Sequence, residues 1–169
     1  MDVAGGKVAA PDVPRIVAEA VDAGLTVATA ESLTAGMVCA ELGNVPGASG
    51  MLMGAVVAYQ NSVKENVLGV SGELLSRSGS VDADVARQMA QGVRRLTGAS
   101  LGIATTGVAG PQPHDGQQVG TVFIALADEY GAWCGRHIFE GDRAAIRRQT
   151  TAQALLQLQQ AIDAARPAR

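Results

Sequence analysis

Aromatic and charged residues are both scarce in this chain. Only 3% of its 169 residues are Phe, Trp or Tyr, and 17% are Asp, Glu, Lys or Arg, with a formal net charge of -3. Together with a hydrophobic content of 47%, this excludes the polar, highly charged composition of a disordered chain. A chain without a basic excess is also not expected to bind nucleic acid, which needs cations to neutralise its phosphates. The length predicts one domain with a sizeable core.

Cysteine and histidine are rarer still. Cys39, Cys134, His114 and His137 lie far apart in the sequence and form no CxxC or Cys/His cluster, so we expect no metal site. The first residues lack the pattern of a signal peptide, and the longest strongly apolar run, 51–59, is shorter than the roughly 20 residues of a membrane helix. We therefore expect a cytoplasmic protein with no membrane partner.

Lysine is almost absent. Lys7 and Lys64 are the only lysines, and the other eleven basic residues are arginines. A coding bias that replaces surface Lys by Arg explains the ratio. Under such a bias, however, a lysine that remains is more often one that needs an amine able to titrate, and Lys64 is the one inside the expected domain.

Strand-like and helix-like segments alternate along most of the chain. We expect a mobile leader over residues 1–10 and a single domain over 11–166, with strands near 25–30, 51–60, 100–106, 119–128 and 132–140. Helices are expected after Asp12, from the ESLTAG segment to about Leu42, at 61–68, 71–77 and 82–97, and from Asp142 onward. This order predicts an α/β fold, a three-layer α/β/α sandwich whose five-stranded mixed sheet is mostly parallel.

Two segments stand where ligands bind in open α/β sheets, beyond the carboxyl ends of strands. In the first, ESLTAG (31–36), Ser32 and Thr34 lie at the start of an expected helix, where backbone N–H groups hold an anion or a developing oxyanion. The alternative is that either hydroxyl only caps the helix. The second segment, TGVAGP (106–111), predicts either a backbone cradle for a phosphate or ribose, or a plain turn.

Two further segments carry groups that transfer protons or bind anions. Tyr59 and Lys64 flank the end of the second expected strand, and a desolvated lysine beside a serine activates it as a nucleophile. A solvated lysine is the alternative. Arg143 stands near a helix start and is a candidate phosphate ligand, although a solvated basic face also explains it.

These segments together resemble a known family. TAESLTAG, VVAYQNSVK (56–64), TGVAGP followed by VGTVFIAL, and FEGDRAAIRRQ are similar to motifs of the C-terminal domain of CinA, the competence/damage-inducible protein, in the same order. The resemblance covers about residues 11–163. It implies the three-layer sandwich, self-association into a homo-oligomer, and a hydrolase that converts nicotinamide mononucleotide to nicotinate mononucleotide and ammonia without metal or cofactor.

The resemblance also implies roles for individual residues. Ser32 is the expected nucleophile, and Tyr59 and Lys64 complete the catalytic site, with Tyr59 relaying or orienting the proton. The expected substrate-binding residues are Glu31, Thr34, Asn61, Thr106, Gly107, Gly110 and Arg143. The chain departs from the usual AESCTGG at Leu33 and Ala35. A non-catalytic module that senses nucleotides or binds a partner is the alternative function, but the joint presence of the three catalytic residues favours the enzyme.

Overall fold

The computed structural model describes residues 8–165 and contains one five-stranded sheet. The strands are β1 (Val27–Glu31), β2 (Leu52–Val57), β3 (Leu101–Gly107), β4 (Thr121–Ala127) and β5 (Ala132–Ile138), arranged in the order β2-β1-β3-β4-β5. β1 pairs in parallel with β2 and β3, whereas β4 is antiparallel to β3 and β5. Only β4 therefore runs against the other four strands of this sheet.

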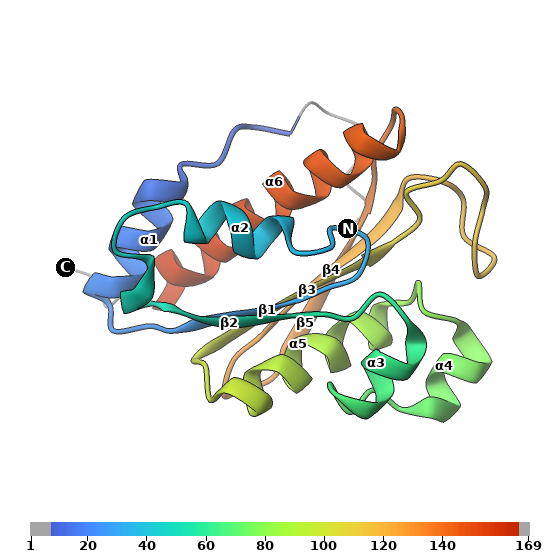
Figure 1. The fold of residues 1–169 in the computed structure, drawn as a ribbon, viewed down its shortest axis with the longest axis horizontal. Coiled ribbons are helices and arrows are strands. Elements are labelled where there is room, and N and C mark those ends of the chain that lie inside the picture. Colours follow the sequence, from blue (N-terminus) through green and yellow to red (C-terminus); the bar gives the residue numbers. More distant parts are fainter. Residues whose placement is uncertain (1–7, 166–169) are drawn as a thin grey trace.

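Helices cover both faces of the sheet (Figure 1). One face carries α1 (Val13–Asp22), α2 (Met37–Gly43) and α6 (Arg143–Ala165). The other carries α5 (Ala83–Thr97), with α3 (Asn61–Asn66) and α4 (Gly72–Ser78) beside it, and a short 3-10 helix, Ala48–Gly50, precedes β2. The predicted three-layer α/β/α sandwich is confirmed.

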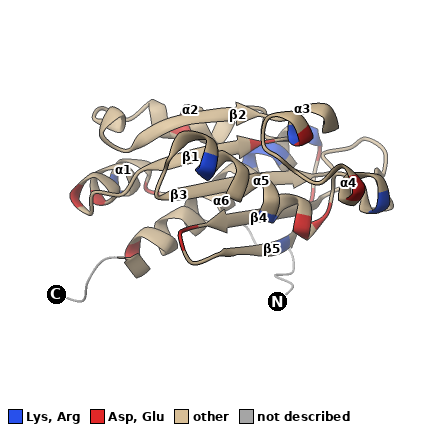
Figure 2. Cartoon of the chain, turned by 90° about the horizontal axis from the view of Figure 1, so that it is seen from below, with Lys and Arg blue, Asp and Glu red and all other residues tan. Residues whose placement is uncertain are grey.

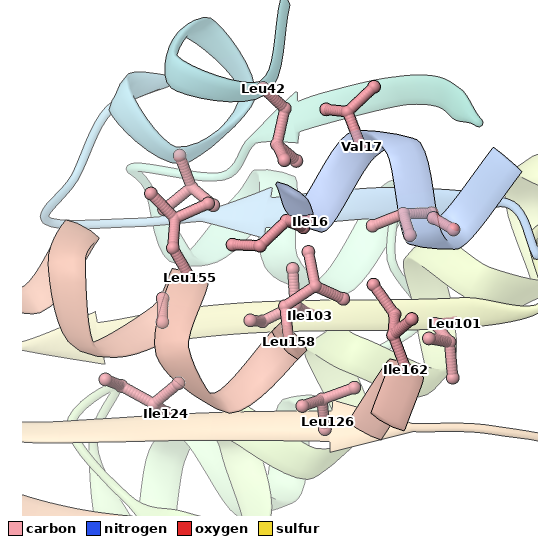
Figure 3. Packing of buried hydrophobic residues seen from close by; sticks show 14 of the residues in the cluster. Ile16, Val17, Leu42, Leu101, Ile103, Ile124, Leu126, Leu155, Leu158 and Ile162 are labelled. Carbon is pink, nitrogen blue, oxygen red and sulfur yellow. The ribbon is translucent and has the colours of Figure 1, made fainter. Parts of the chain in front are cut away.

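The two faces are packed with side chains of different size. Figure 3 shows the face under α1, α2 and α6, where Ile103 and Ile124 of the sheet meet Ile16 and Leu158. The opposite face is rich in alanine, so α5 lies close to the sheet. A Cβ on Gly102 of β3 would lie 2.2 Å from the carbonyl oxygen of Ala90, a contact that only glycine avoids.

The segment after β1 differs from the prediction. The helix expected from the ESLTAG segment begins only at Met37, because Ala35 and Gly36 have φ angles of 50° and 96° and cannot continue a right-handed helix. Residues 32–36 form a tight turn instead. This turn leaves Ser32 at the end of β1 and outside any helix.

The remaining predictions concern the chain termini and membrane-spanning helices. Most of the expected leader, residues 1–7, and residue 166 at the end of the expected domain lie outside the described residues. Between residues 8 and 165, no helix combines the length and apolar character needed to cross a membrane. Figure 2 shows acidic and basic positions interspersed along the ribbon, with most of it uncharged.

Candidate active site

Three chain segments meet at the carboxyl ends of the parallel strands, as the connectivity of the sheet requires. Ser32 follows β1, Tyr59 follows β2 and the loop 108–118 follows β3, while the start of α6 lies at the same end of the sheet (Figure 1). They enclose a cavity of about 320 Å³. Its lining comprises Ser32, Leu33, Tyr59, Ser80, Gly107, Ala109, Gly110, Pro111, Gln112, Pro113, His114 and Arg143.

Lys64 lies beneath this cavity and is completely buried. Its Nζ donates hydrogen bonds to the Ser32 Oγ at 3.2 Å, the Ala58 carbonyl at 2.7 Å and the Tyr59 carbonyl at 3.2 Å. Burial lowers the pKa of Lys64 from its ordinary 10.5 to about 8, against the opposing influence of the Asp115 carboxylate. The alternative of a solvated lysine does not fit this environment.

The three partners of Lys64 suit a neutral amine as well as an ammonium. A neutral amine has two N–H donors, which match the two carbonyl oxygens, and one lone pair, which is left to accept the Ser32 hydroxyl proton. With a pKa of about 8, an appreciable fraction of Lys64 is neutral at mildly basic pH. The pair can therefore transfer a proton directly from Ser32 to Lys64.

The turn that carries Ser32 is held from several sides. The Ser32 N–H donates to the Thr105 carbonyl on β3 at 3.0 Å, and the Thr34 and Thr105 hydroxyls are 2.7 Å apart. The Ala35 N–H closes the turn on the Ser32 carbonyl at 3.1 Å. These contacts fix the direction in which β1 presents the Ser32 side chain.

Tyr59 and Arg143 form a separate pair at the mouth of the cavity. The Arg143 guanidinium donates to the Tyr59 hydroxyl at 2.6 Å and to the Gly110 carbonyl at 3.0 Å. The Tyr59 hydroxyl is thus engaged by Arg143 and does not stand between Ser32 and Lys64, which are already in direct contact. The expected proton relay through Tyr59 finds no support in this geometry, and only the backbone carbonyl of Tyr59 touches Lys64.

Glu31 does not line the cavity, contrary to its expected role in substrate binding. Its side chain is buried, and its two carboxylate oxygens accept hydrogen bonds from the N–H groups of Gly36, Val38 and Cys39 and from the Thr29 hydroxyl. A carboxylate here compensates the unpaired N–H groups at the start of α2. Glu31 therefore anchors α2 behind the Ser32 turn.

Three other expected substrate-binding residues also lie outside the cavity lining. Thr34 is buried against Thr105, and the Thr106 hydroxyl donates to the Ser80 carbonyl at 2.7 Å. Asn61 is exposed at the start of α3. Of the substrate-binding residues named from the sequence, only Gly107, Gly110 and Arg143 reach the cavity.

A latch between Asp115 and Ser80, beside the cavity, was not predicted from the sequence. The Asp115 carboxylate accepts hydrogen bonds from the Ser80 N–H, the Ser80 hydroxyl and the Val81 N–H, and so ties the loop 108–118 to the segment between α4 and α5. Burial raises the pKa of Asp115, but the hydrogen bonds from Ser80 outweigh it and hold this pKa below its ordinary value. Gly79 allows the close approach, because a Cβ there would lie 2.3 Å from the Asp115 Cγ.

The sequence offered little signal for this latch. Asp115 stands in a loop rich in glycine and proline, where Asp is a common turn residue, and its partner is 35 residues away in sequence. Within residues 8–165, no three His, Cys, Asp or Glu side chains are grouped so that they could hold a metal ion.

The chain is similar to known proteins in both sequence and structure. The CinA C-terminal domain matches residues 12–162. A CinA-like protein of Anaeromyxobacter dehalogenans is 45% identical over 151 residues, covering 89% of this chain and 36% of the relative. A CinA-like protein of Geobacter sulfurreducens is 45% identical over 133 residues, covering 78% of this chain and 32% of the relative. The chain thus spans about a third of the length of these curated relatives.

Solved structures agree with the sequence matches. The CinA superfamily protein of Klebsiella pneumoniae superposes with a TM-score of 0.86 at 29% identity, covering 90% of this chain and 96% of that one. The competence/damage inducible protein of Agrobacterium tumefaciens superposes with a TM-score of 0.81 at 30% identity, covering 96% and 99% of the two chains. The matched segment includes Ser32, Tyr59 and Lys64 at one site and runs almost from end to end of the described fold. The chain therefore belongs to the CinA C-terminal domain family.

Proposed function

We propose that the protein is a metal-independent amidohydrolase that converts nicotinamide mononucleotide to nicotinate mononucleotide and ammonia. The observation that carries the proposal is the buried amine of Lys64, whose Nζ lies 3.2 Å from the Ser32 Oγ beside a cavity. Burial of an amine costs free energy, so a buried lysine beside a serine at the edge of a cavity supports a chemical role for the amine. The pairing suits a nucleophile with its base.

The proposed reaction uses Lys64 as base and then as acid. Neutral Lys64 takes the proton of the Ser32 hydroxyl while the Ser32 Oγ bonds to the carboxamide carbon, and the negative charge moves to the carboxamide oxygen. The Lys64 ammonium returns the proton to the nitrogen as the C–N bond breaks, which releases ammonia and leaves an ester on Ser32. Lys64 then takes a proton from a water molecule whose oxygen bonds to the ester carbon, the bond from that carbon to the Ser32 Oγ breaks, and the Lys64 ammonium returns the proton to the Ser32 Oγ, which releases the nicotinate product.

The cavity mouth supplies a counter-charge for the 5′-phosphate of the nucleotide. Arg143 lines the cavity, and its guanidinium is held between Tyr59 and the loop 108–118. A guanidinium fixed in this way is suited to bind a phosphate through two parallel hydrogen bonds. We therefore assign phosphate binding to Arg143, with Tyr59 positioning it.

The decisive experiment is release of ammonia from nicotinamide mononucleotide by the purified protein in the presence of a chelator. We expect turnover that the chelator does not change. Tight binding of the nucleotide without release of ammonia would contradict the amidohydrolase and favour a module that senses nucleotides. Nicotinamide riboside, which lacks the phosphate, serves as the matched substrate and should react poorly if Arg143 binds the phosphate.

A further inference from the structure

A second arginine of α6 contacts the turn that carries the nucleophile. Arg147 lies one helical turn after Arg143 and is partly buried. Its Nε donates to the Leu33 carbonyl at 2.8 Å, and one terminal nitrogen donates to the Thr34 carbonyl at 3.2 Å. None of the ion pairs among residues 8–165 includes Arg147. Its guanidinium is therefore held by backbone carbonyls and not by a carboxylate in that part of the chain.

This contact fixes the orientation of a peptide plane. A trans peptide is planar, and its N–H points opposite to its C=O, so the Leu33 carbonyl that faces Arg147 turns the Thr34 N–H away from α6. The Thr34 N–H donates to no backbone carbonyl among the described residues. It is the second N–H group after Ser32 in the chain.

We propose that Arg147 is a positioning residue, which holds the peptide plane between Leu33 and Thr34 so that the Thr34 N–H stabilises the oxyanion of the reaction. The proposal rests on the proposed function. The planar fork of a guanidinium can bind two successive carbonyl oxygens in fixed directions, which an ammonium does less well. Preorganised N–H donors lower the barrier because they need no reorientation when the charge develops.

The turn after Ser32 does not depend on Arg147 for its stability. The turn is already tied to β3 through Ser32 and Thr34, and to α2 through the buried Glu31 carboxylate. Removal of Arg147 should therefore leave the turn in place and loosen only the direction of the Thr34 N–H. Binding of the ground-state substrate should then change little, whereas the chemical step should slow.

The test compares Arg147→Ala with Arg147→Lys and with the control Arg148→Ala, an exposed neighbour on the same helix. We expect Arg147→Ala to lower kcat by roughly 10- to 100-fold with KM within about threefold of the parent. Arg147→Lys should recover part of the loss, and Arg148→Ala should match the parent. An unchanged kcat in Arg147→Ala, or a loss confined to KM, would overturn the proposal.

A further variant and a further measurement complete this test of Arg147. If Arg147→Ala does not fold, Arg147→Met keeps an unbranched side chain of similar length but has no donor for the Leu33 carbonyl, and a parental kcat in that variant overturns the proposal. The rate at which phenylmethanesulfonyl fluoride modifies Ser32 is measured as well, because this reaction also builds negative charge on oxygen but needs no nucleotide. If the parent does not hydrolyse nicotinamide mononucleotide, the proposed function fails, whereas equal rates of Ser32 modification in parent and Arg147→Ala contradict the role of Arg147.

Discussion

The two ends of the sheet each carry a cavity, and the larger one is not the candidate site. The cavity at the amino ends of β1 and β3 measures about 530 Å³ and is lined by residues such as Leu25, Tyr130 and Trp133. The cavity at the carboxyl ends measures about 320 Å³. Size alone would therefore select the end of the sheet opposite to Ser32 and Lys64.

Strain and buried charge distinguish the ends. Among the described residues, the non-glycine residues with positive φ are Ala35 and Asp115, and both belong to segments around the smaller cavity. The buried Lys64 lies there too. Strained backbone and buried ionisable groups cost stability and persist where chemistry needs them, so these features locate the site better than volume does.

The strongest test of this contrast removes the nucleophile. Ser32→Ala should lower kcat by at least roughly 10³-fold, because no other hydroxyl is hydrogen-bonded to Lys64 among the described residues. Calorimetric titration should still show binding of the nucleotide. Ser62→Ala, an exposed serine on α3, is the matched control and should retain parental rates. Near-parental turnover in Ser32→Ala would exclude Ser32 as the nucleophile.

The second test concerns the titration of Lys64. Its lowered pKa of about 8 means that the neutral base is depleted below that pH, so kcat should rise with pH from 6 through about 8 and then level off. Lys64→Arg should lower kcat by roughly 10²- to 10⁴-fold at every pH, because a guanidinium does not deprotonate. The measurement is turnover from pH 6 to 10.

A control is needed because the arginine in Lys64→Arg is larger than the buried lysine that it replaces. It separates loss of the base from the effect of this larger side chain. Lys64→Met has a similar length without an amine, so it should be as inactive as Lys64→Arg while its thermal unfolding shows a folded protein. A Lys64→Arg variant with near-normal rates would end the Ser–Lys mechanism for this protein.

The third test weakens binding at the mouth of the site. Arg143→Ala should raise KM for nicotinamide mononucleotide by roughly 10- to 150-fold, which corresponds to the loss of about 1.5–3 kcal/mol for a charged hydrogen bond. The kcat should change much less, since Arg143 contacts neither Ser32 nor Lys64. Arg148→Ala is the control. Equal KM values for Arg143→Ala and the parent would reduce Arg143 to a structural link between Tyr59 and the loop 108–118.

The sequence predicted the architecture but not the finer arrangement of the site. Hydrophobic periodicity and the alternation of strands and helices are local patterns, and they gave the order of elements and the sandwich. Ser32 contacts Lys64, and Tyr59 lines the same cavity as Ser32, because parallel strands place their carboxyl ends at one edge. The number of lysines alone had already drawn attention to Lys64.

The errors concern contacts between residues that are distant in sequence. The sequence did not reveal that Glu31 turns toward α2, that Asp115 reaches Ser80, or that Arg147 holds the turn after Ser32. Such hydrogen bonds depend on the tertiary arrangement of loops and helix ends, which no local pattern encodes. Position 35, in contrast, is alanine where the motif that the chain resembles has glycine. Its φ of 50° explains the glycine of that motif, because glycine adopts this conformation without strain.

The fourth test removes backbone strain at one end of the sheet with one variant and introduces it at the other end with a second variant. Ala35→Gly should raise the free energy of unfolding by about 1 kcal/mol, because the left-handed conformation disfavours a side chain. Gly24→Ala, at the opposite end with a φ of 65° and open space around it, should lower that free energy by about the same amount. Chemical denaturation measures both changes. A loss of stability in Ala35→Gly would show that strain is not stored in the Ser32 turn.

The smallest effect is expected from the larger cavity. Trp133 lines it and is 49% exposed, so Trp133→Ala should cost little stability. Both kcat and KM for nicotinamide mononucleotide should stay within about twofold of the parent, because Trp133 lies at the amino end of β5, and β3 and β4 lie between that strand and β1, which leads to Ser32. Steady-state kinetics beside Arg143→Ala provide the comparison. A tenfold rise of KM in Trp133→Ala would mean that the larger cavity takes part in substrate binding, and volume would then have been the better guide.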